Sequence, residues 1–246
     1  MADLIQKNQE PSAPAPKNKG NKIAALIFLV LAVVCGLVYW KTNLTVVLAV
    51  GGGALLISFI NFIAGINFPT YTPEAKRYGD MGERVTGSIL ERYLPDGYTV
   101  IQNAKIYYDD GVSETDNIIV GRTGVFVVEV KNIKGYITGD YADRDWHQDK
   151  TDRYGIEHEK EFYSPVKQIG THIYRLANFL RDNKIFTHIN GAVYFANPAT
   201  EVELTGEPNN VPVFTHDTTQ ELLDYIMSGT ANLSESKIQK IIQLLS

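Results

Sequence analysis

Two long apolar runs stand out against the polar rest of the chain. Residues 23–40 contain no charged side chain over 18 positions, and residues 44–66 contain none over 23 positions. Because a helix rises 1.5 Å per residue, each run is near the ~20 residues that cross the hydrocarbon core of a bilayer. Only Lys41, Thr42 and Asn43 separate the two runs. The pattern therefore predicts a two-helix transmembrane hairpin whose ends emerge on the same side of a lipid bilayer.

Basic residues flank this predicted hairpin. Four lysines precede the first run and three basic residues follow the second, whereas Lys41 alone lies between the runs. Lys and Arg favour the cytoplasmic side of a membrane. We therefore expect a multi-pass protein of the cell (inner) membrane, with residues 1–22 as a disordered cytoplasmic tail and the C-terminal part also in the cytoplasm. A cleaved signal peptide fits less well, because Trp40 and Lys41 follow the first run in place of small residues.

Small residues interrupt the second apolar run. Gly51, Gly52 and Gly53 follow Ala49 at close spacing, and small residues let membrane helices pack closely. An oligomer formed through the second span is one interpretation of these glycines, and loose apolar filler is an equally good one. Cys35 is the only cysteine, so no disulfide forms within one chain.

After residues 67–77, a predicted linker, the pattern changes to short periods. Apolar residues at helical spacing predict helices at 80–93, 165–183, 218–227 and 234–245. Short apolar and β-branched runs predict strands at 98–101, 104–108, 116–120, 125–131, 136–138, 192–195 and 211–214. Residues 140–161 are too polar and charged for a core. Strands and helices mix without strict alternation, which predicts one α/β domain over residues 78–246 with a single mixed sheet flanked by helices.

The charge is distributed unevenly between these parts. The chain has 23 Lys+Arg and 28 Asp+Glu, a net charge of −5. Residues 1–77 carry a net charge of +4, and residues 78–246 carry 16 basic and 25 acidic residues, a net charge of −9. An acidic domain argues against nonspecific binding of polyanions. Any nucleic acid would have to be attracted by local basic residues, for which the candidates are Lys105, Arg122, Lys134 and Lys167.

A predicted hairpin places three charges together. Residues 116–120 and 125–131 flank a four-residue Gly-Arg-Thr-Gly connection, which is typical of a β-hairpin. Side chains alternate along a strand, so Glu129 and Lys131 share one face. If paired residue numbers sum to 245, Asp116 lies opposite Glu129, and if they sum to 247 it lies opposite Lys131. Both registers bring the three charges to one face.

Two opposed carboxylates repel each other, which raises at least one pKa unless a cation lies between them. Mg²⁺ typically takes one or two carboxylates together with water and substrate phosphate. A neighbouring Lys131 then holds the phosphate or acts on the attacking water. The set is therefore typical of a metal-dependent phosphodiesterase. The alternative is a solvated strand end on which Glu129 and Lys131 form an ordinary surface pair.

The order of motifs along the chain resembles a known family. Asp116, twelve further residues and then Glu129-Val130-Lys131 are similar to the core of the PD-(D/E)XK nuclease superfamily, and more narrowly to the NERD (nuclease-related) domain. The residues that carry the resemblance are 79–83, 116–120, 123–132, 135, 146 and 164–168. The family usually has Asn where this chain has Ser164, and Ser serves equally well as a helix cap.

The resemblance implies a restriction-endonuclease-like fold and a role for each matching residue. Asp116 and Glu129 would bind Mg²⁺ (or Mn²⁺), with the Val130 carbonyl as a third ligand and Lys131 as the catalytic lysine. Glu83 would be an additional ligand of metal or water, and Gln168 a helix-start residue that contacts the site. The implied activity is a membrane-anchored, metal-dependent nuclease that hydrolyses phosphodiester bonds of DNA.

Simpler readings remain open for three of the candidate residues. Glu83 near a helix start is favoured by the helix dipole alone, and Gln168 just after Pro165 has the position of a cap. His172 lies one helical turn after Gln168 and either approaches the site or is an ordinary half-buried histidine.

A second function is also compatible with the sequence. In this alternative the domain is a noncatalytic nucleic-acid- or protein-binding module tethered to the membrane. A binding module has no need for two opposed carboxylates and a lysine, which favours the nuclease. The chain has no Gly-x-x-x-x-Gly-Lys loop for ATP and no Gly-x-Ser-x-Gly turn for acyl transfer.

Overall fold

The computed structural model describes residues 1–6, 27, 29–31, 33–34, 37–40, 55–56, 73–109, 111–152, 154–208 and 210–246. Contacts divide the chain into two compact units. One consists of Met1–Gln9 with Pro73–Ser246, and the other is Glu10–Thr72.

The predicted membrane spans at 23–40 and 44–66 belong to the second unit and lie mainly outside the described residues. The residues described there are helical, and apolar side chains such as Leu37 and Trp40 are exposed. Within the described residues, no helix is both long enough and apolar enough to cross a membrane. The two spans therefore stay predictions.

Within the described residues, the first unit contains the ten strands, four α-helices and the short 3-10 helix η1. In chain order its elements are β1 (Asp3–Gln6), α3 (Pro73–Tyr93), β2 (Thr99–Tyr108), β3 (Gly111–Gly121), β4 (Gly124–Lys131), β5 (Gly135–Asp140), β6 (Asp145–Thr151), β7 (Glu157–Tyr163), α4 (Pro165–Asp182), β8 (Ile189–Phe195), β9 (Thr200–Thr205), β10 (Val213–Thr215), η1 (His216–Thr218), α5 (Thr219–Met227) and α6 (Glu235–Leu245).

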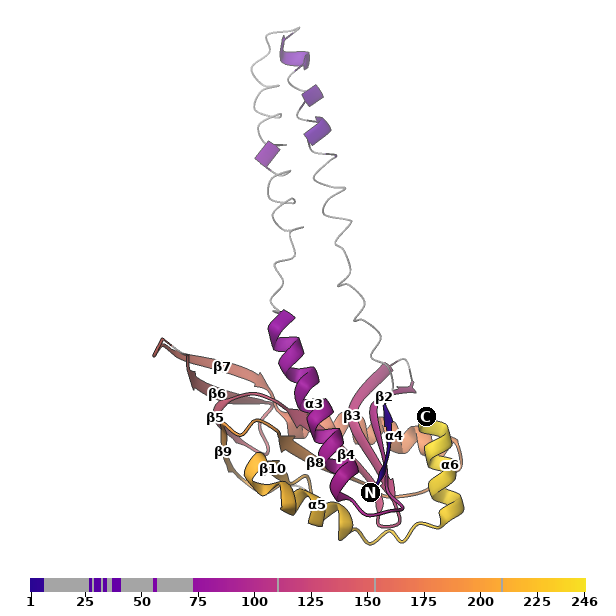
Figure 1. The fold of residues 1–246 in the computed structure, drawn as a ribbon. Helices are drawn as coiled ribbons and strands as arrows, with labels where there is room; N and C mark the ends of the chain where they lie inside the picture. Colours follow the sequence, from indigo (N-terminus) through magenta and orange to yellow (C-terminus); the bar gives the residue numbers. More distant parts are fainter. Residues whose placement is uncertain are drawn as a thin grey trace. The chain divides into compact units, whose positions relative to one another are not determined.

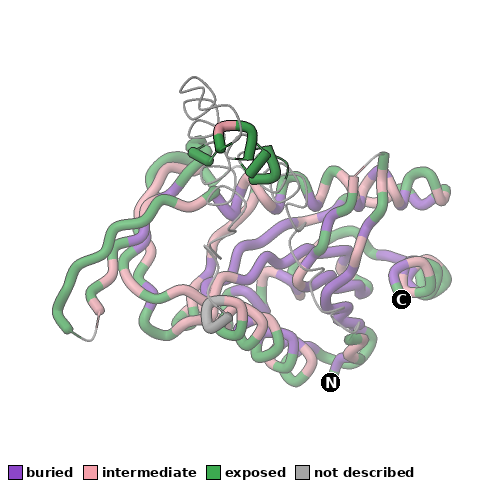
Figure 2. Tube along the Cα trace, turned by 90° about the horizontal axis from the view of Figure 1, so that it is seen from above, coloured by how far each residue is buried: buried purple, intermediate pink, exposed green. Residues whose placement is uncertain are grey.

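The main sheet has the strand order β1-β2-β3-β4-β8-β10 and apolar cores on both faces. On one face, side chains of β2, β3 and β4 pack with α4 and α6, including Leu176 and Ile241. On the other face they pack with α3 and α5, including Leu90 and Leu222 (Figure 1). Figure 2 shows the buried strands between these two layers of helices. This arrangement confirms a mixed α/β fold flanked by helices.

The expectation of a single sheet is wrong. A second sheet forms with the order β7-β6-β5-β9, and β6 and most of β7 lie in the segment 140–161, whose polarity argues against a core. One face of this sheet packs Ile137 and Trp146 into a third apolar cluster. In β7 every residue except Phe162 is exposed. The polar sequence, which does not predict a strand here, therefore reflects side chains that face solvent. A small apolar core is enough to stabilise this second sheet, because only one of its faces is buried.

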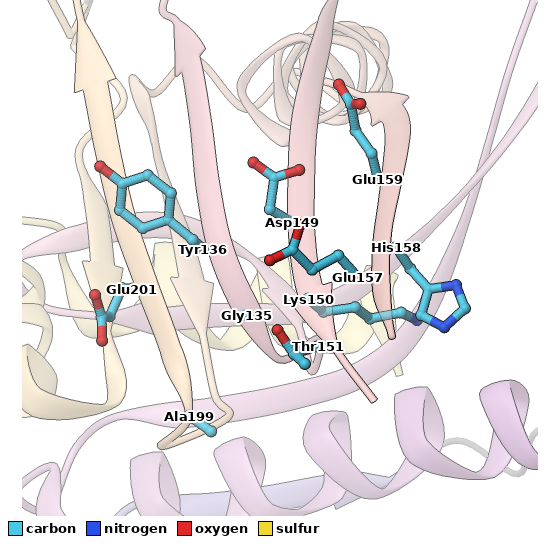
Figure 3. Close-up of a pocket in the computed structure, with 10 residues that line it drawn as sticks. All are labelled: Gly135, Tyr136, Asp149, Lys150, Thr151, Glu157, His158, Glu159, Ala199 and Glu201. Carbon is cyan, nitrogen blue, oxygen red and sulfur yellow. The ribbon is translucent and has the colours of Figure 1, made fainter. Parts of the chain in front are cut away.

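The second sheet also carries a shallow hollow of about 690 Å³. Four carboxylates line it, against one lysine and one histidine (Figure 3). The full lining is Gly135, Tyr136, Asp149, Lys150, Thr151, Glu157, His158, Glu159, Ala199 and Glu201. This surface is therefore acidic and repels phosphate.

The expectation that the whole N-terminal tail is disordered is wrong for its first residues. β1 pairs in parallel with β2, in a register that matches Asp3 with Thr99. The N–H of Ala2 donates to the Glu91 carbonyl at 2.9 Å, and Ala2 is 4% exposed. Backbone pairing with an otherwise open strand edge outweighs the low apolar content of this segment. The strand ends at Gln6, and residues 7–22 lie outside the described part.

Helix α3 begins at Pro73, so it includes residues that were assigned to a linker. Its close approach to the sheet depends on small residues. A Cβ at Gly82 would collide with the Asn132 side chain, and one at Gly87 would collide with the Gln102 side chain. Glu83 lies in the middle of this helix. The interpretation that the helix dipole at a helix start is the reason for an acidic residue here is therefore wrong.

Other elements agree with the sequence pattern. Helices α4, α5 and α6 begin and end within about two residues of their predicted limits. In the hairpin of β3 and β4, Ile118 pairs with Val127 and Gly121 with Gly124. These pairs sum to 245, so the first of the two registers is confirmed.

Candidate active site

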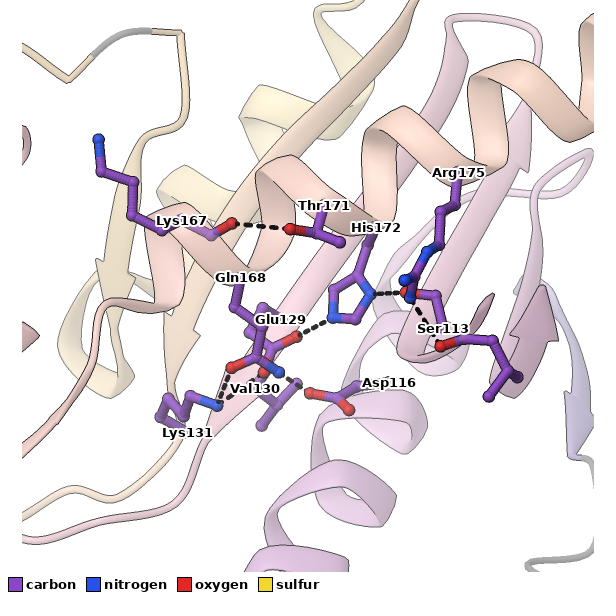
Figure 4. A network of polar contacts seen from close by, with 11 residues as sticks. Ser113, Asp116, Glu129, Val130, Lys131, Lys167, Gln168, Thr171, His172 and Arg175 are labelled. Atoms are coloured by element: carbon purple, nitrogen blue, oxygen red, sulfur yellow. Dashed lines mark hydrogen bonds and ion pairs between the residues drawn. The ribbon is translucent and has the colours of Figure 1, made fainter. Parts of the chain in front are cut away.

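The site lies where β3 and β4 separate. Their paired residues run from Gly121↔Gly124 to Asn117↔Val128. One position further, Oδ2 of Asp116 accepts a 2.7 Å hydrogen bond from the N–H of Val130 (Figure 4). A side-chain carboxylate thus takes a main-chain donor of β4 at the end of the ladder. Asp116 and Glu129 thus lie on adjacent strands, each one position beyond the last paired residues.

Strand β2 breaks its regular alternation next to Asp116. Gln102 pairs with Asn117 and Ala104 pairs with Thr115, which leaves Asn103 across from Asp116. Asn103 has φ 54°, a left-handed conformation that Asn tolerates better than most residues. The alternation of side chains between the two faces of β2 therefore shifts at Asn103. As a result, Ile101 before it and Ala104 after it both face the core that contains α4.

Lys131 is held between two side chains. Its Nζ lies 2.7 Å from Oε1 of Glu129 and donates a 2.9 Å hydrogen bond to Oε1 of Gln168 (Figure 4). The Lys131 side chain is 22% exposed and that of Glu129 is 2% exposed. The ammonium therefore lies at the boundary between the buried carboxylate and solvent, where it can meet a negatively charged ligand. The reading of Glu129 and Lys131 as an ordinary surface pair is wrong, because Glu129 is buried.

The other oxygen of Glu129 faces helix α4. Nε2 of His172 lies 3.3 Å from Oε2 of Glu129, and Nδ1 of His172 hydrogen-bonds to Oγ of Ser113. Figure 4 shows the imidazole between these two groups. His172 is 7% exposed and Ser113 is 3% exposed. The structure therefore brings His172 to the site, which the sequence left open, and adds Ser113, for which the sequence indicated no histidine partner and no role.

The two opposed carboxyl groups differ in acidity. Burial, followed by the negative charges of Glu129 and Glu83, raises the pKa of Asp116 well above its usual range. Burial also acts to raise the pKa of Glu129, but His172 and Lys131 outweigh it and leave this pKa below its usual range. Because the two groups interact, the protonation of each carboxyl depends on that of the other. The first proton is held at Asp116, with Glu129 ionised.

Glu83 approaches the same pair from the opposite layer. Burial is the main cause that raises the pKa of Glu83, and the charges of Asp80 and Glu129 add to it. The main-chain carbonyl of Glu83 accepts a 2.9 Å hydrogen bond from Nε2 of Gln102. Three acids from α3, β3 and β4 therefore influence one another electrostatically.

The chemistry of these residues fits a hard divalent cation. Carboxylate oxygens are the ligands that Mg²⁺ and Mn²⁺ prefer. Oε2 of Glu129 is buried and has no well-aligned hydrogen bond within the described part of the chain. Among the described residues, no group of three or more His, Cys, Asp and Glu side chains is arranged to hold a metal alone. Two carboxylates with water and substrate phosphate remain the appropriate set, and the Val130 carbonyl stays a predicted ligand.

Comparison with known proteins identifies part of the chain. The family model of the nuclease-related domain, NERD, matches residues 78–196. Residues 78–196 carry a nuclease-related domain. This range contains all the site residues described above, from Glu83 to His172.

Two individual proteins are also similar. An uncharacterized protein of Bacillus anthracis is 35% identical over 97 residues, which cover 39% of this chain and 43% of that protein. The chain therefore matches less than half of this relative. A Vibrio cholerae protein of known crystal structure is 11% identical, with a TM-score of 0.33, and the match covers 87% of this chain and 53% of that chain. This structural likeness is too weak to define the fold.

Within the nuclease-related domain, the predicted basic residues do not all lie near the site. Arg122 is in the turn that joins β3 to β4, at the other end of β4 from Lys131, and its Nε donates to Asn232 at 3.4 Å. The expectation that Arg122 lies near the site is therefore wrong. Lys167 directly precedes Gln168 at the start of α4.

The start of α4 also differs from expectation. Ser164 is in the N-cap position, but its side chain makes no capping hydrogen bond, and its buried Oγ lacks a partner among the described residues. The main-chain N–H of Gln168 donates to the Ser164 main-chain carbonyl at 3.0 Å, as in a regular helix. The Gln168 side chain accepts a hydrogen bond from Lys131, so the interpretation of Gln168 as only a cap is wrong.

Proposed function

We propose that the nuclease-related domain hydrolyses phosphodiester bonds of nucleic acid in a metal-dependent reaction, with DNA as the substrate. The observation that carries this proposal is the position of Lys131, which lies 2.7 Å from a buried Glu129 beside the opposed Asp116. Burying carboxylates against each other is costly. A site that binds a cation and a phosphate gives this arrangement a function, whereas a structural strand end does not.

Each residue has a distinct task in the proposed reaction. Asp116 and Glu129, with the main chain of Val130, would hold Mg²⁺ or Mn²⁺. Such an ion stabilises charge on the phosphate and lowers the pKa of bound water. Lys131 binds a phosphate oxygen of the substrate through its partly exposed ammonium, and Gln168 fixes the direction of that ammonium. Glu83, whose pKa is raised, accepts a hydrogen bond from the attacking water and then its proton.

The proposal also includes attachment to the inner membrane, with the domain in the cytoplasm. Residues 3–6 pair with residues 99–102 in one sheet, so the segments before and after residues 10–72 belong to one folded unit. Any membrane crossing by residues 10–72 must therefore occur an even number of times. The two predicted spans satisfy this requirement, and the glycines of the second span would serve an oligomer.

The nuclease proposal is tested with the full chain in detergent micelles. Labelled DNA and RNA are incubated with Mg²⁺, Mn²⁺ or EDTA. We expect cleavage of DNA with either metal and none with EDTA, and a loss of about 100-fold or more in Lys131→Ala and Asp116→Ala. Lys160→Ala is the matched control, since Lys160 is exposed on β7. Cleavage at the wild-type rate by both site variants would refute the assignment, and metal-independent binding without cleavage would favour the binding module.

The membrane proposal needs a separate test of orientation. In a Cys35→Ala background, Thr42→Cys would place a thiol in the predicted periplasmic connection, and Tyr107→Cys would place one on an exposed position of β2. A membrane-impermeant maleimide should label position 42 in intact spheroplasts and position 107 only after lysis. Equal labelling of both before lysis would contradict the proposed orientation.

A further inference from the structure

Helix α4 presents a polar stripe to the site. Gln168, His172 and Arg175 are spaced at i, i+4 and i+7, so they lie on one face. Gln168 binds Lys131, His172 meets Glu129 and Ser113, and Arg175 donates a 2.6 Å hydrogen bond to the Val112 carbonyl (Figure 4). Gln168 already has a place in the proposed reaction. His172 and Ser113 do not, although both are buried polar residues, whose burial is costly without a partner.

The contacts of His172 define which of its nitrogens carries a proton. If Nε2 had no proton, its lone pair would face an oxygen of the Glu129 carboxylate at 3.3 Å, and two acceptors would be opposed. Nε2 therefore carries the hydrogen on the side of the ring that faces Glu129, at 3.3 Å from Oε2 but without the alignment of a regular hydrogen bond. The Ser113 hydroxyl satisfies Nδ1 in either case, as a donor to the neutral ring or as an acceptor from the charged ring. Ser113 thus fixes the ring so that a donor always faces Glu129.

The result is a carboxylate with a donor beside each oxygen. Lys131 lies at Oε1 of Glu129 and His172 lies at Oε2. Each carboxylate oxygen has two lone pairs, so both oxygens keep capacity for a cation. The two donors come from different elements, β4 and α4, and therefore fix the rotation of the carboxylate as well as its position.

We propose that Ser113 and His172 are positioning residues that hold the Glu129 carboxylate in the orientation that binds a divalent cation. This inference rests on the proposed function, because it assigns a task toward the metal. Neither residue touches metal or substrate. They act through Glu129, in the way that outer hydrogen-bond partners orient metal ligands in proteins.

We expect substitutions of His172 and Ser113 to lower the affinity for metal more than they lower the cleavage rate at saturating metal. Loss of an outer partner typically weakens metal binding about 10–100-fold. His172→Leu removes the donor at Oε2, and Ser113→Ala leaves that donor but frees the ring to rotate. We therefore expect Mn²⁺ affinity to fall about 10-fold or more in His172→Leu and less in Ser113→Ala. In His172→Gln, the amide can donate to Glu129 and accept from Ser113, so affinity should largely recover.

The test measures Mn²⁺ binding directly, by isothermal titration calorimetry on the full chain in detergent. Thr171→Ala is the matched control, because Thr171 is exposed on the same turn of α4. Thermal unfolding in EDTA shows whether each variant folds, and cleavage is measured across Mn²⁺ concentrations. A positioning role predicts a higher Mn²⁺ requirement with cleavage largely restored at saturation, and rescue by His172→Gln.

The possible failures are distinguishable. If the wild type binds Mn²⁺ and cuts DNA, and His172→Leu and Ser113→Ala bind Mn²⁺ as tightly as the wild type, this inference is overturned while the proposed function stands. It is also overturned if His172→Gln is as weak as His172→Leu although both fold. If the wild type neither binds Mn²⁺ nor cuts DNA, the proposed function fails and the inference fails with it.

Discussion

Oδ2 of Asp116 accepts a 2.7 Å hydrogen bond from the main-chain N–H of Val130, which directly follows Glu129 in β4. The bond ties a side chain of one strand to the backbone of the next, where the regular ladder has ended. Asp116 is therefore unable to move away from Glu129 without losing this bond. The fold holds two carboxyl groups together, which raises the pKa of Asp116, and a bound cation would relieve the repulsion that arises when both are ionised.

This repulsion predicts that Asp116→Asn stabilises the metal-free protein. The pKa of Asp116 is raised in the folded state by burial and by the charges of Glu129 and Glu83. A raised folded pKa means that the proton favours folding, so stability is greatest below the ordinary carboxyl pKa and falls as pH rises toward the folded pKa. In EDTA, the melting temperature of Asp116→Asn minus that of the wild type should increase between about pH 4 and pH 8.

With bound metal, we expect the wild type to be more stable than Asp116→Asn, the opposite of the order in EDTA. Binding requires the ionised carboxylate, so Mg²⁺ should stabilise the wild type increasingly as pH rises and should have little effect on Asp116→Asn. Asp109→Asn is the control, because Asp109 is exposed and its φ of 54° suits Asn. A melting difference that stays constant with pH would show that Asp116 has an ordinary acidity.

A second prediction concerns the support of Lys131 by Gln168. Gln168→Ala removes the 2.9 Å hydrogen bond but leaves the ion pair of Lys131 with Glu129. The ammonium becomes less well directed, so we expect kcat to fall about 10-fold, far less than in Lys131→Ala. Gln220→Ala, on the exposed side of α5, should cut DNA at the wild-type rate. An equal loss in Gln168→Ala and Lys131→Ala would instead place Gln168 among the groups that contact substrate.

A third prediction separates two glycines of helix α3. A Cβ at Gly82 would collide with Asn132, the neighbour of Lys131, whereas a Cβ at Gly79 meets nothing within 4 Å. Gly79→Ala should stabilise the domain by about 0.5–1 kcal/mol, because Ala is the better helix former. Gly82→Ala should destabilise it by about 1–3 kcal/mol through overpacking and should move Glu83 away from the site. Urea unfolding of both variants measures the difference, and stabilisation by both would contradict the close packing of α3.

The elements that could be predicted from the sequence are those whose burial has a clear period. Helix α4 has an apolar stripe that includes Ile169, Leu176 and Leu180, and β4 alternates between two buried faces. Strand β7 lacks such a pattern because nearly all its side chains face solvent. Strand β1 is four residues long and is specified by backbone pairing with β2. Neither feature leaves a recognisable period in the sequence.

The site was predictable only in part for a similar reason. Glu129 and Lys131 are two residues apart on one strand, so their common face follows from local geometry. Ser113 and His172 are 59 positions apart. Their meeting depends on the break in alternation at Asn103, which shifts the faces of β2 and β3. A polar residue one turn after Gln168 was the only available signal for His172.

The last prediction tests whether β1 belongs to the domain. The amino group of Met1 lies 2.6 Å from Asp96, Ala2 is buried, and Leu4 and Ile5 pack against opposite cores. Deletion of residues 2–6 should lower the free energy of unfolding by about 2–4 kcal/mol, because two half-buried apolar side chains and four strand pairs are lost. Deletion of residues 12–16, a Pro- and Ala-rich segment beyond the strand, is the control and should have no effect on urea unfolding. The opened edge of β2 should also make the first deletion prone to aggregate. Equal stability of the two deletions would show that the domain folds without its N-terminal strand.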